Sequence, residues 1–77
     1  MRISSKHVLE LGSLSETYFK LLSEEDYDFK TKEILVEIEK EDDSIIANIF
    51  TNSIVDLKIA DSAFIKSLEV IEKTLNV

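Results

Sequence analysis

Few side chains in this sequence are suited to nucleophilic or acid–base chemistry in a shared site. Ser and Asp are abundant, but His7 is the only histidine and cysteine is absent. A Ser-His-Asp arrangement would have to use His7, and no serine lies in the sequence pattern of a nucleophile elbow. A single glycine, Gly12, cannot build a glycine-rich phosphate loop. We therefore interpret His7 as a half-buried strand residue, and we expect no catalytic residues and no cofactor.

Two acidic runs, at residues 24–28 and 41–43, are the remaining candidates for chemistry, because clustered carboxylates bind Ca²⁺. Neither run has the glycine or the spaced ligands of an EF-hand loop. The lack of cysteine and the single histidine also exclude the common zinc sites. We interpret both runs as solvated loops and expect no metal site.

The composition indicates one small folded domain spanning residues 1–77, with 44% hydrophobic residues. The formal net charge of −7 repels phosphate backbones, so we expect at most indirect contact with nucleic acid. No apolar run reaches the ~18 residues that a membrane span needs, and we expect a cytoplasmic protein. A core of this size is marginal, and without disulfides the support left open is another polypeptide.

Three segments alternate apolar and polar residues and predict strands over residues 1–11, 32–40 and 44–51. An acidic turn joins the second and third segments, which predicts a β-hairpin. The aperiodic segment 24–31 is interpreted as a loop, with Tyr27 or Phe29 anchoring it to the core.

Two further segments have helical spacing. Ser13 and Glu16 form a capping-box pattern that predicts a helix ending near Ser23. The longer helix is predicted over Ile54–Leu75, with capping residues at 51–53. Their apolar stripes are Leu14, Tyr18, Leu21 and Leu22, and Leu57, Phe64, Leu68, Ile71 and Leu75. The order β-α-β-β-α predicts an α+β fold in which a three-stranded antiparallel sheet has both helices on one face.

One apolar surface remains on the predicted sheet. The face without helices should be polar. Leu35, Ile46 and Phe50 nevertheless occupy the alternate strand positions whose side chains point toward that face. A bulge, or side chains folding over the sheet edge, would explain them within one chain. The sharper interpretation is a dimer in which two such faces pack together.

A second apolar surface remains on the long helix. Ile59, Ala63 and Val70 form a shoulder beside the main stripe, although a helix on a sheet needs only one stripe. Packing against the first helix explains this shoulder as well as packing against a helix of another protein does.

The segment 56–66, Asp-Leu-Lys-Ile-Ala-Asp-Ser-Ala-Phe-Ile-Lys, resembles a helix of the small-subunit family of the KEOPS complex, also called the CTAG/Pcc family. Members have Leu-Arg-Ala-x-x-Asn-Ser-(aromatic)-(aliphatic)-Arg after a hairpin, and the element order and length also match. Lys58 and Lys66 stand at the two Arg positions, and Ser62 stands where members have Asn. Because of these departures and its acidic composition, the chain resembles a divergent archaeal paralogue of this family.

The resemblance implies a non-catalytic accessory subunit of a complex that attaches threonylcarbamoyl to an adenosine of tRNA. Family members dimerise through their sheets and pack their helices with the catalytic subunit. The implied partners are a second copy or a paralogous small subunit, and the catalytic threonylcarbamoyl-transferase subunit, with tRNA contacted only indirectly. The two surplus surfaces coincide with these contacts. The residues involved would be Leu35, Ile46 and Phe50 on the sheet, and Lys58, Ile59, Ala63, Lys66 and Val70 on the helix.

The alternative is an unrelated small homodimeric α+β protein that binds a small ligand or another protein. A ligand site would need an internal cavity, and no polar residue pattern points to one. Direct tRNA binding by this chain is a third hypothesis, which the acidic composition disfavours.

Overall fold

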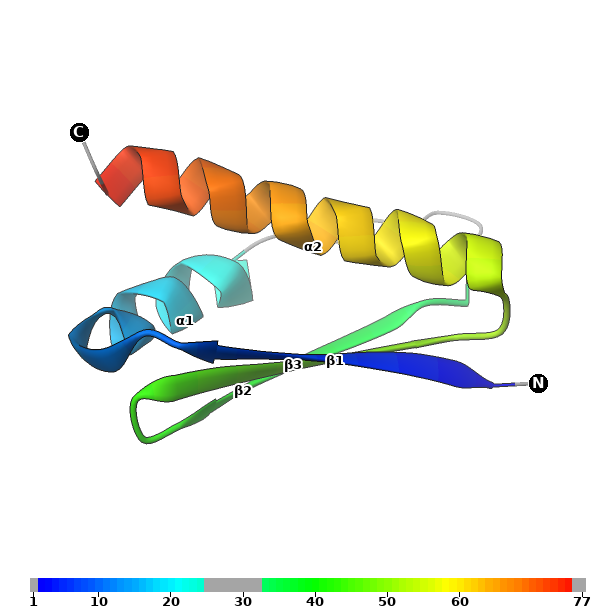
Figure 1. Ribbon diagram of the computed structural model, residues 1–77, viewed down its shortest axis with the longest axis horizontal. Coiled ribbons are helices and arrows are strands. Elements are labelled where there is room, and N and C mark those ends of the chain that lie inside the picture. Colours follow the sequence, from blue (N-terminus) through cyan, green and yellow to red (C-terminus); the bar gives the residue numbers. More distant parts are fainter. Residues whose placement is uncertain (1, 25–32, 76–77) are drawn as a thin grey trace.

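The computed structural model describes residues 2–24 and 33–75, which form an α+β fold. Its strands are β1 (Ile3–Glu10), β2 (Leu35–Glu41) and β3 (Ser44–Thr51), and its helices are the 3-10 turn η1 (Gly12–Leu14), α1 (Ser15–Glu24) and α2 (Ile54–Leu75). Both α-helices lie on the same face of the sheet (Figure 1). The predicted fold class and the order β-α-β-β-α are therefore confirmed.

β3 is the central strand and pairs antiparallel with both β1 and β2. The predicted hairpin between β2 and β3 is closed by a two-residue turn, in which Asp42 has a φ of 52°. Asp tolerates this left-handed conformation better than most residues do. The N–H groups of Leu11 and Gly12 both donate to the carbonyl of Asp43 at 3.1 Å, which holds the end of β1 against the hairpin turn.

The core lies between the sheet and the two helices. Side chains of β3 alternate between half-buried and buried along the whole strand, as expected when one face is covered. The buried apolar side chains are Ile45, Ala47 and Ile49 in β3, Tyr18 and Leu22 in α1, and Ala60, Phe64 and Ile71 in α2. Two predicted stripe residues are not core residues, because Leu14 is 49% exposed and Leu75 is 38% exposed.

The first helix begins differently from the prediction. The chain passes through η1, so Ser13 lies inside a 3-10 turn and has no side-chain hydrogen bond among the described residues. The hydroxyl of Ser15 instead donates to the carbonyl of Gly12 at 2.8 Å, and Gly12 adopts a φ of 60° that suits glycine. The predicted capping box is therefore wrong.

β2 begins at Leu35 rather than at residue 32, and the predicted loop anchors Tyr27 and Phe29 lie outside the described residues.

The bounds and the cap of α2 agree with the prediction. The Ser53 hydroxyl accepts a hydrogen bond from the N–H of Asp56 at 3.1 Å, and the Ser53 carbonyl accepts one from the N–H of Leu57. This side-chain cap satisfies a donor that the first turn of a helix leaves free. Asp56 also places a negative charge where the helix dipole favours it.

Phe64 is the largest fully buried side chain, and the exposed neighbour Ile65 provides its control. We expect Phe64→Ala to lower the free energy of unfolding by about 3–5 kcal/mol, because it removes a core ring and leaves a cavity. Ile65→Ala should cost less than about 1 kcal/mol, because Ile65 is 47% exposed. Urea denaturation followed by circular dichroism measures both. Equal losses in the two variants would contradict this assignment of the core.

Candidate interaction surfaces and a polar cluster

The helix-free face of the sheet carries every second residue of the three strands. The pairing register arranges these side chains in rows that run from β1 through β3 to β2. Successive rows are Ser4, Phe50 and Leu35, then Lys6, Asn48 and Glu37, and then Val8, Ile46 and Glu39. The predicted sheet-face residues Leu35, Ile46 and Phe50 therefore all lie on this face.

The apolar residues of this face form two pairs rather than one continuous patch. Leu35 and Phe50 are direct cross-strand neighbours, whereas Ile46 lies beside Val8, two rows further along. Val8 is 53% exposed and was absent from the prediction. Its place beside Ile46 follows from the β1–β3 register, which the sequence alternation alone does not give. The polar row that contains Asn48 separates the two pairs.

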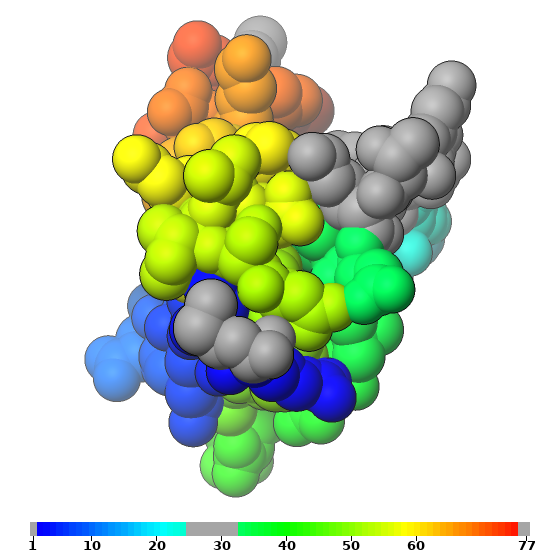
Figure 2. All heavy atoms as spheres, turned by 90° about the vertical axis from the view of Figure 1, so that its right-hand side faces the viewer, coloured from blue at the N-terminus to red at the C-terminus, as the bar shows by residue number. Residues whose placement is uncertain are grey.

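A hollow of about 350 Å³ lies at the end of the sheet where β1 and β2 begin and β3 ends, and Figure 2 views the molecule from this end. The Arg2 guanidinium carbon lies 4.9 Å from the centre of the Phe50 ring, within range of a cation–π interaction. The side-chain amide of Asn52 donates to the carboxylate of Glu33 across the same hollow. The apolar pair formed by Leu35 and Phe50 is therefore bordered by charged groups of both signs.

The second predicted surface lies along one side of α2. Successive helix residues are about 100° apart, so Ile59, Ala63, Lys66 and Val70 fall within an arc of about 60°. We call these four residues the α2 flank. Lys58 lies about 80° beyond this arc, so the predicted set of five residues does not share one face.

The α2 flank is largely open to solvent. Ile59 is 42% exposed, Val70 is 58% exposed, and Ala63 is half-buried. Val70 also lines a hollow with Leu21 and Glu24 of α1. Within the described residues α1 contacts α2 and still leaves two members of the shoulder, Ile59 and Val70, exposed.

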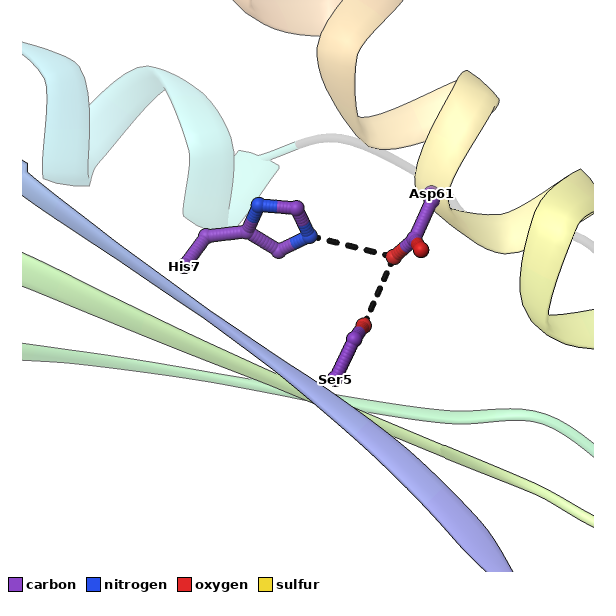
Figure 3. A network of polar contacts seen from close by, with 3 residues as sticks. All are labelled: Ser5, His7 and Asp61. Atoms are coloured by element: carbon purple, nitrogen blue, oxygen red, sulfur yellow. Dashed lines mark hydrogen bonds and ion pairs between the residues drawn. The ribbon is translucent and has the colours of Figure 1, made fainter.

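A polar cluster joins β1 to α2 on the helix-covered face (Figure 3). The Ser5 hydroxyl donates to Oδ1 of Asp61 at 2.7 Å, and Nε2 of His7 lies 3.0 Å from the same oxygen. The side chains of His7 and Asp61 are 25% and 30% exposed. The His7 ring also packs against Phe64, with ring centres 5.1 Å apart. His7 is thus the half-buried strand residue that the sequence predicted.

The three residue types match those of a catalytic triad, but the connections differ. In a triad the imidazole lies between the hydroxyl and the carboxylate: it takes the proton of the hydroxyl, while the carboxylate orients the ring. Here the hydroxyl of Ser5 and the imidazole of His7 both bond to one oxygen of Asp61. Nδ1 of His7 points away from both partners (Figure 3). The arrangement satisfies a partly buried carboxylate and links a strand to a helix.

Asp61 is the member of this cluster that the sequence analysis did not connect with the others. Ser5 and His7 alternate with Leu9 along β1, and Leu9 packs on the core, so both polar side chains also lie on the face that the helices cover. Polar groups in such positions normally find a hydrogen-bond partner. Asp61, one turn before Phe64 on the predicted helix, was the residue able to supply it.

Comparison of the chain with family models, with curated proteins and with solved structures finds no match in any of the three. Within residues 2–24 and 33–75, no three His, Cys, Asp or Glu side chains are placed to hold a metal ion. The helices in these ranges are also too short or too polar to cross a membrane.

The cluster predicts a specific loss of stability. We expect Asp61→Ala to lower the free energy of unfolding by about 1–2 kcal/mol, because the substitution removes the acceptor of both bonds. Glu69→Ala is the matched control, since Glu69 is an exposed acid on the same helix with no partner among the described residues. Chemical denaturation compares the two variants. A loss no greater than that of Glu69→Ala would contradict a stabilising role for the cluster.

Proposed function

We propose that this chain is a dimerising, non-catalytic accessory subunit of a KEOPS-like complex, which attaches threonylcarbamoyl to an adenosine of tRNA. The observation that carries the proposal is the helix-free sheet face with Val8, Leu35, Ile46 and Phe50 upon it. In a sheet with one covered face, the other face is ordinarily polar. Apolar side chains gathered on an uncovered face are typical of a surface that binds protein.

The sheet face fits a second polypeptide of the same kind better than it fits a small ligand. Its side chains stand on three adjacent antiparallel strands, which suits the packing of two sheets into a sandwich. Leu35 is 46% exposed and Val8 is 53% exposed, so a facing sheet would remove apolar surface from water on both edge strands.

The α2 flank supports a second contact, with helices of the catalytic subunit. Ile59 and Val70 supply exposed apolar area, and the small side chain of Ala63 between them allows close approach of another helix. Lys66 adds a cation at the border of this surface. Ile59, Ala63 and Lys66 lie within segment 56–66, which resembles the family helix, whereas Val70 lies one turn beyond it.

The charge of the chain fits an indirect relation to tRNA. With a net charge of −7, this subunit repels the phosphate backbone, so contact with tRNA falls to other subunits of a cytoplasmic complex. Lys58 and Lys66 keep the charge of the family's arginines but lose their planar guanidinium groups. A divergent archaeal paralogue of this kind would pair through its sheet with a second copy or with a paralogous small subunit, and would limit the size of the assembly.

Substitution at Phe50 tests the sheet contact. We expect Phe50→Asp to give a monomer at concentrations where the wild-type chain dimerises, because the change places a charge in the packed face. Leu14→Asp is the control, because Leu14 is an exposed apolar residue on η1, away from both surfaces. Sedimentation velocity reports the mass, and circular dichroism confirms that each variant is folded. A folded Phe50→Asp variant that still dimerises would reject this contact.

Substitution at Ile59 tests the helix contact independently. We expect Ile59→Asp to lose the catalytic subunit while keeping the dimer, because the α2 flank and the sheet face lie on opposite sides of the domain. Ile65→Asp, on the other side of α2, is the control. Mass spectrometry of proteins that co-purify with each tagged chain from its native cell gives the result. Recovery of the catalytic subunit with Ile59→Asp, or its absence with the wild-type chain, would contradict the proposal.

A further inference from the structure

Charge is distributed unequally across the width of the helix-free face. On the β1 side the cations are Arg2, just before the strand, and Lys6 within it. On the β2 side the exposed residues with the same orientation as Leu35 are acidic: Glu33, Glu37, Glu39 and Glu41. Glu10, near the hairpin turn, is the one acid on the β1 side. The face therefore has a basic margin at β1 and an acidic margin at β2, with β3 between them.

The two charges at the centre of this face do not neutralise each other within one chain. Lys6 and Glu37 occupy the same row, on either side of Asn48. They stand two strands apart, which is about 10 Å between their backbones, and no ion pair joins them. Neither has an ion-pair partner among the described residues.

Two copies that pack through this face have two simple symmetric arrangements. A two-fold axis across the strands lays β1 over β1 of the other copy, so Lys6 meets Lys6 and Glu37 meets Glu37. A two-fold axis parallel to the strands lays β1 over β2 of the other copy, so Lys6 meets Glu37 twice. Like charges brought together across an interface are destabilising, whereas opposite charges guide and align the partners.

We propose that the occupant of the helix-free face is a second copy of this chain, packed about an axis parallel to the strands, with Lys6 of each copy paired with Glu37 of the other. This inference rests on the proposed sheet contact and adds the partner and its orientation. In this arrangement Arg2 of each copy likewise faces Glu33, at the acidic margin of the other copy. The same superposition brings Glu10 of each copy toward Glu41 of the other at the hairpin end of the face. This is the end of the interface, where water and salt screen the repulsion.

The central strand supports the same arrangement. With the axis parallel to the strands, β3 lies over β3, so Phe50 and Ile46 approach their own counterparts and form an apolar line. Asn48, between them, meets another Asn48. This contact is self-complementary, because the side-chain amide has both a donor and an acceptor.

The dimensions of the face predict how tightly the copies associate. The three strands, of eight, seven and eight residues, cover roughly 14 Å by 26 Å. This footprint is smaller than the ≈800 Å² per partner of a standard interface. We therefore expect a dimer that dissociates on dilution, in which the Lys6–Glu37 pairs decide orientation and specificity.

Charge reversal tests the inference. We expect Lys6→Glu and Glu37→Lys each to weaken self-association about tenfold, because each turns both ion pairs into repulsions. An equimolar mixture of the two variants should recover near wild-type association, because each copy then offers the charge that the other lacks. Sedimentation velocity over a dilution series measures all three samples, and the differences should shrink in high salt. Only pairing between chains explains recovery in the mixture.

The controls separate local pairing from net charge. Lys20→Glu and Glu16→Lys make the same charge changes on α1, away from the face, and should leave association near wild type. Glu37→Lys brings the net charge from −7 to −5, which by itself favours association, so weakening by this variant must come from the local contact.

The outcomes also distinguish this inference from the proposed function. If the single variants associate like wild type while Phe50→Asp abolishes the dimer, the sheet contact stands and the orientation is wrong. If the wild-type chain alone is monomeric but pairs with another small subunit through the same face, the second copy is the wrong partner. If no partner covers this face, both proposals fail.

Discussion

The central constraint on this domain is that its sheet has two faces and its chain has helices for only one of them. β3 illustrates the consequence, because Ile45 and Ile49 are completely buried under the helices while Ile46 and Phe50 point to the other side and are only half-buried. A domain of 77 residues has little stability to spare, so apolar area left in water matters. The two exposed apolar surfaces are therefore best understood as parts of interfaces.

The covered face is held by apolar packing and by one polar link. Phe64 packs over the centre of the sheet, and one turn earlier on α2 the carboxylate of Asp61 accepts from Ser5 and contacts His7. This link fixes α2 over β1 at a defined position, and the α2 flank then projects on the far side of the helix. The same packing that completes the core therefore sets where the α2 flank lies. The polar cluster uses residue types found in hydrolases, but its connectivity serves structure.

Strong periodicity made much of this fold predictable. The bounds of α2 and β3, the hairpin and the Ser53 cap follow from residue spacing and from local hydrogen bonding, which act within a few residues. The entry into α1 was mispredicted, because the chain passes through a 3-10 turn that begins at Gly12, where φ is positive, and the hydroxyl that bonds to the backbone is that of Ser15. The Asp61 cluster and the pairing of Val8 with Ile46 depend on contacts between distant segments, which alternation within one strand does not specify. Alternation along the strands predicted that Leu35, Ile46 and Phe50 share one face. The polar row that divides them could not be predicted, because it depends on the register in which the strands pair.

The central claim is that a second polypeptide covers the helix-free face. Isotope-filtered nuclear Overhauser spectroscopy on a mixture of labelled and unlabelled chains tests it most directly, because it detects only contacts between copies. The account predicts intermolecular cross-peaks that link Ile46 and Phe50 of one copy to the same residues of the other, and these should fade on dilution. A concentrated sample with no such cross-peaks, in which these side chains remain exposed to solvent, would contradict it.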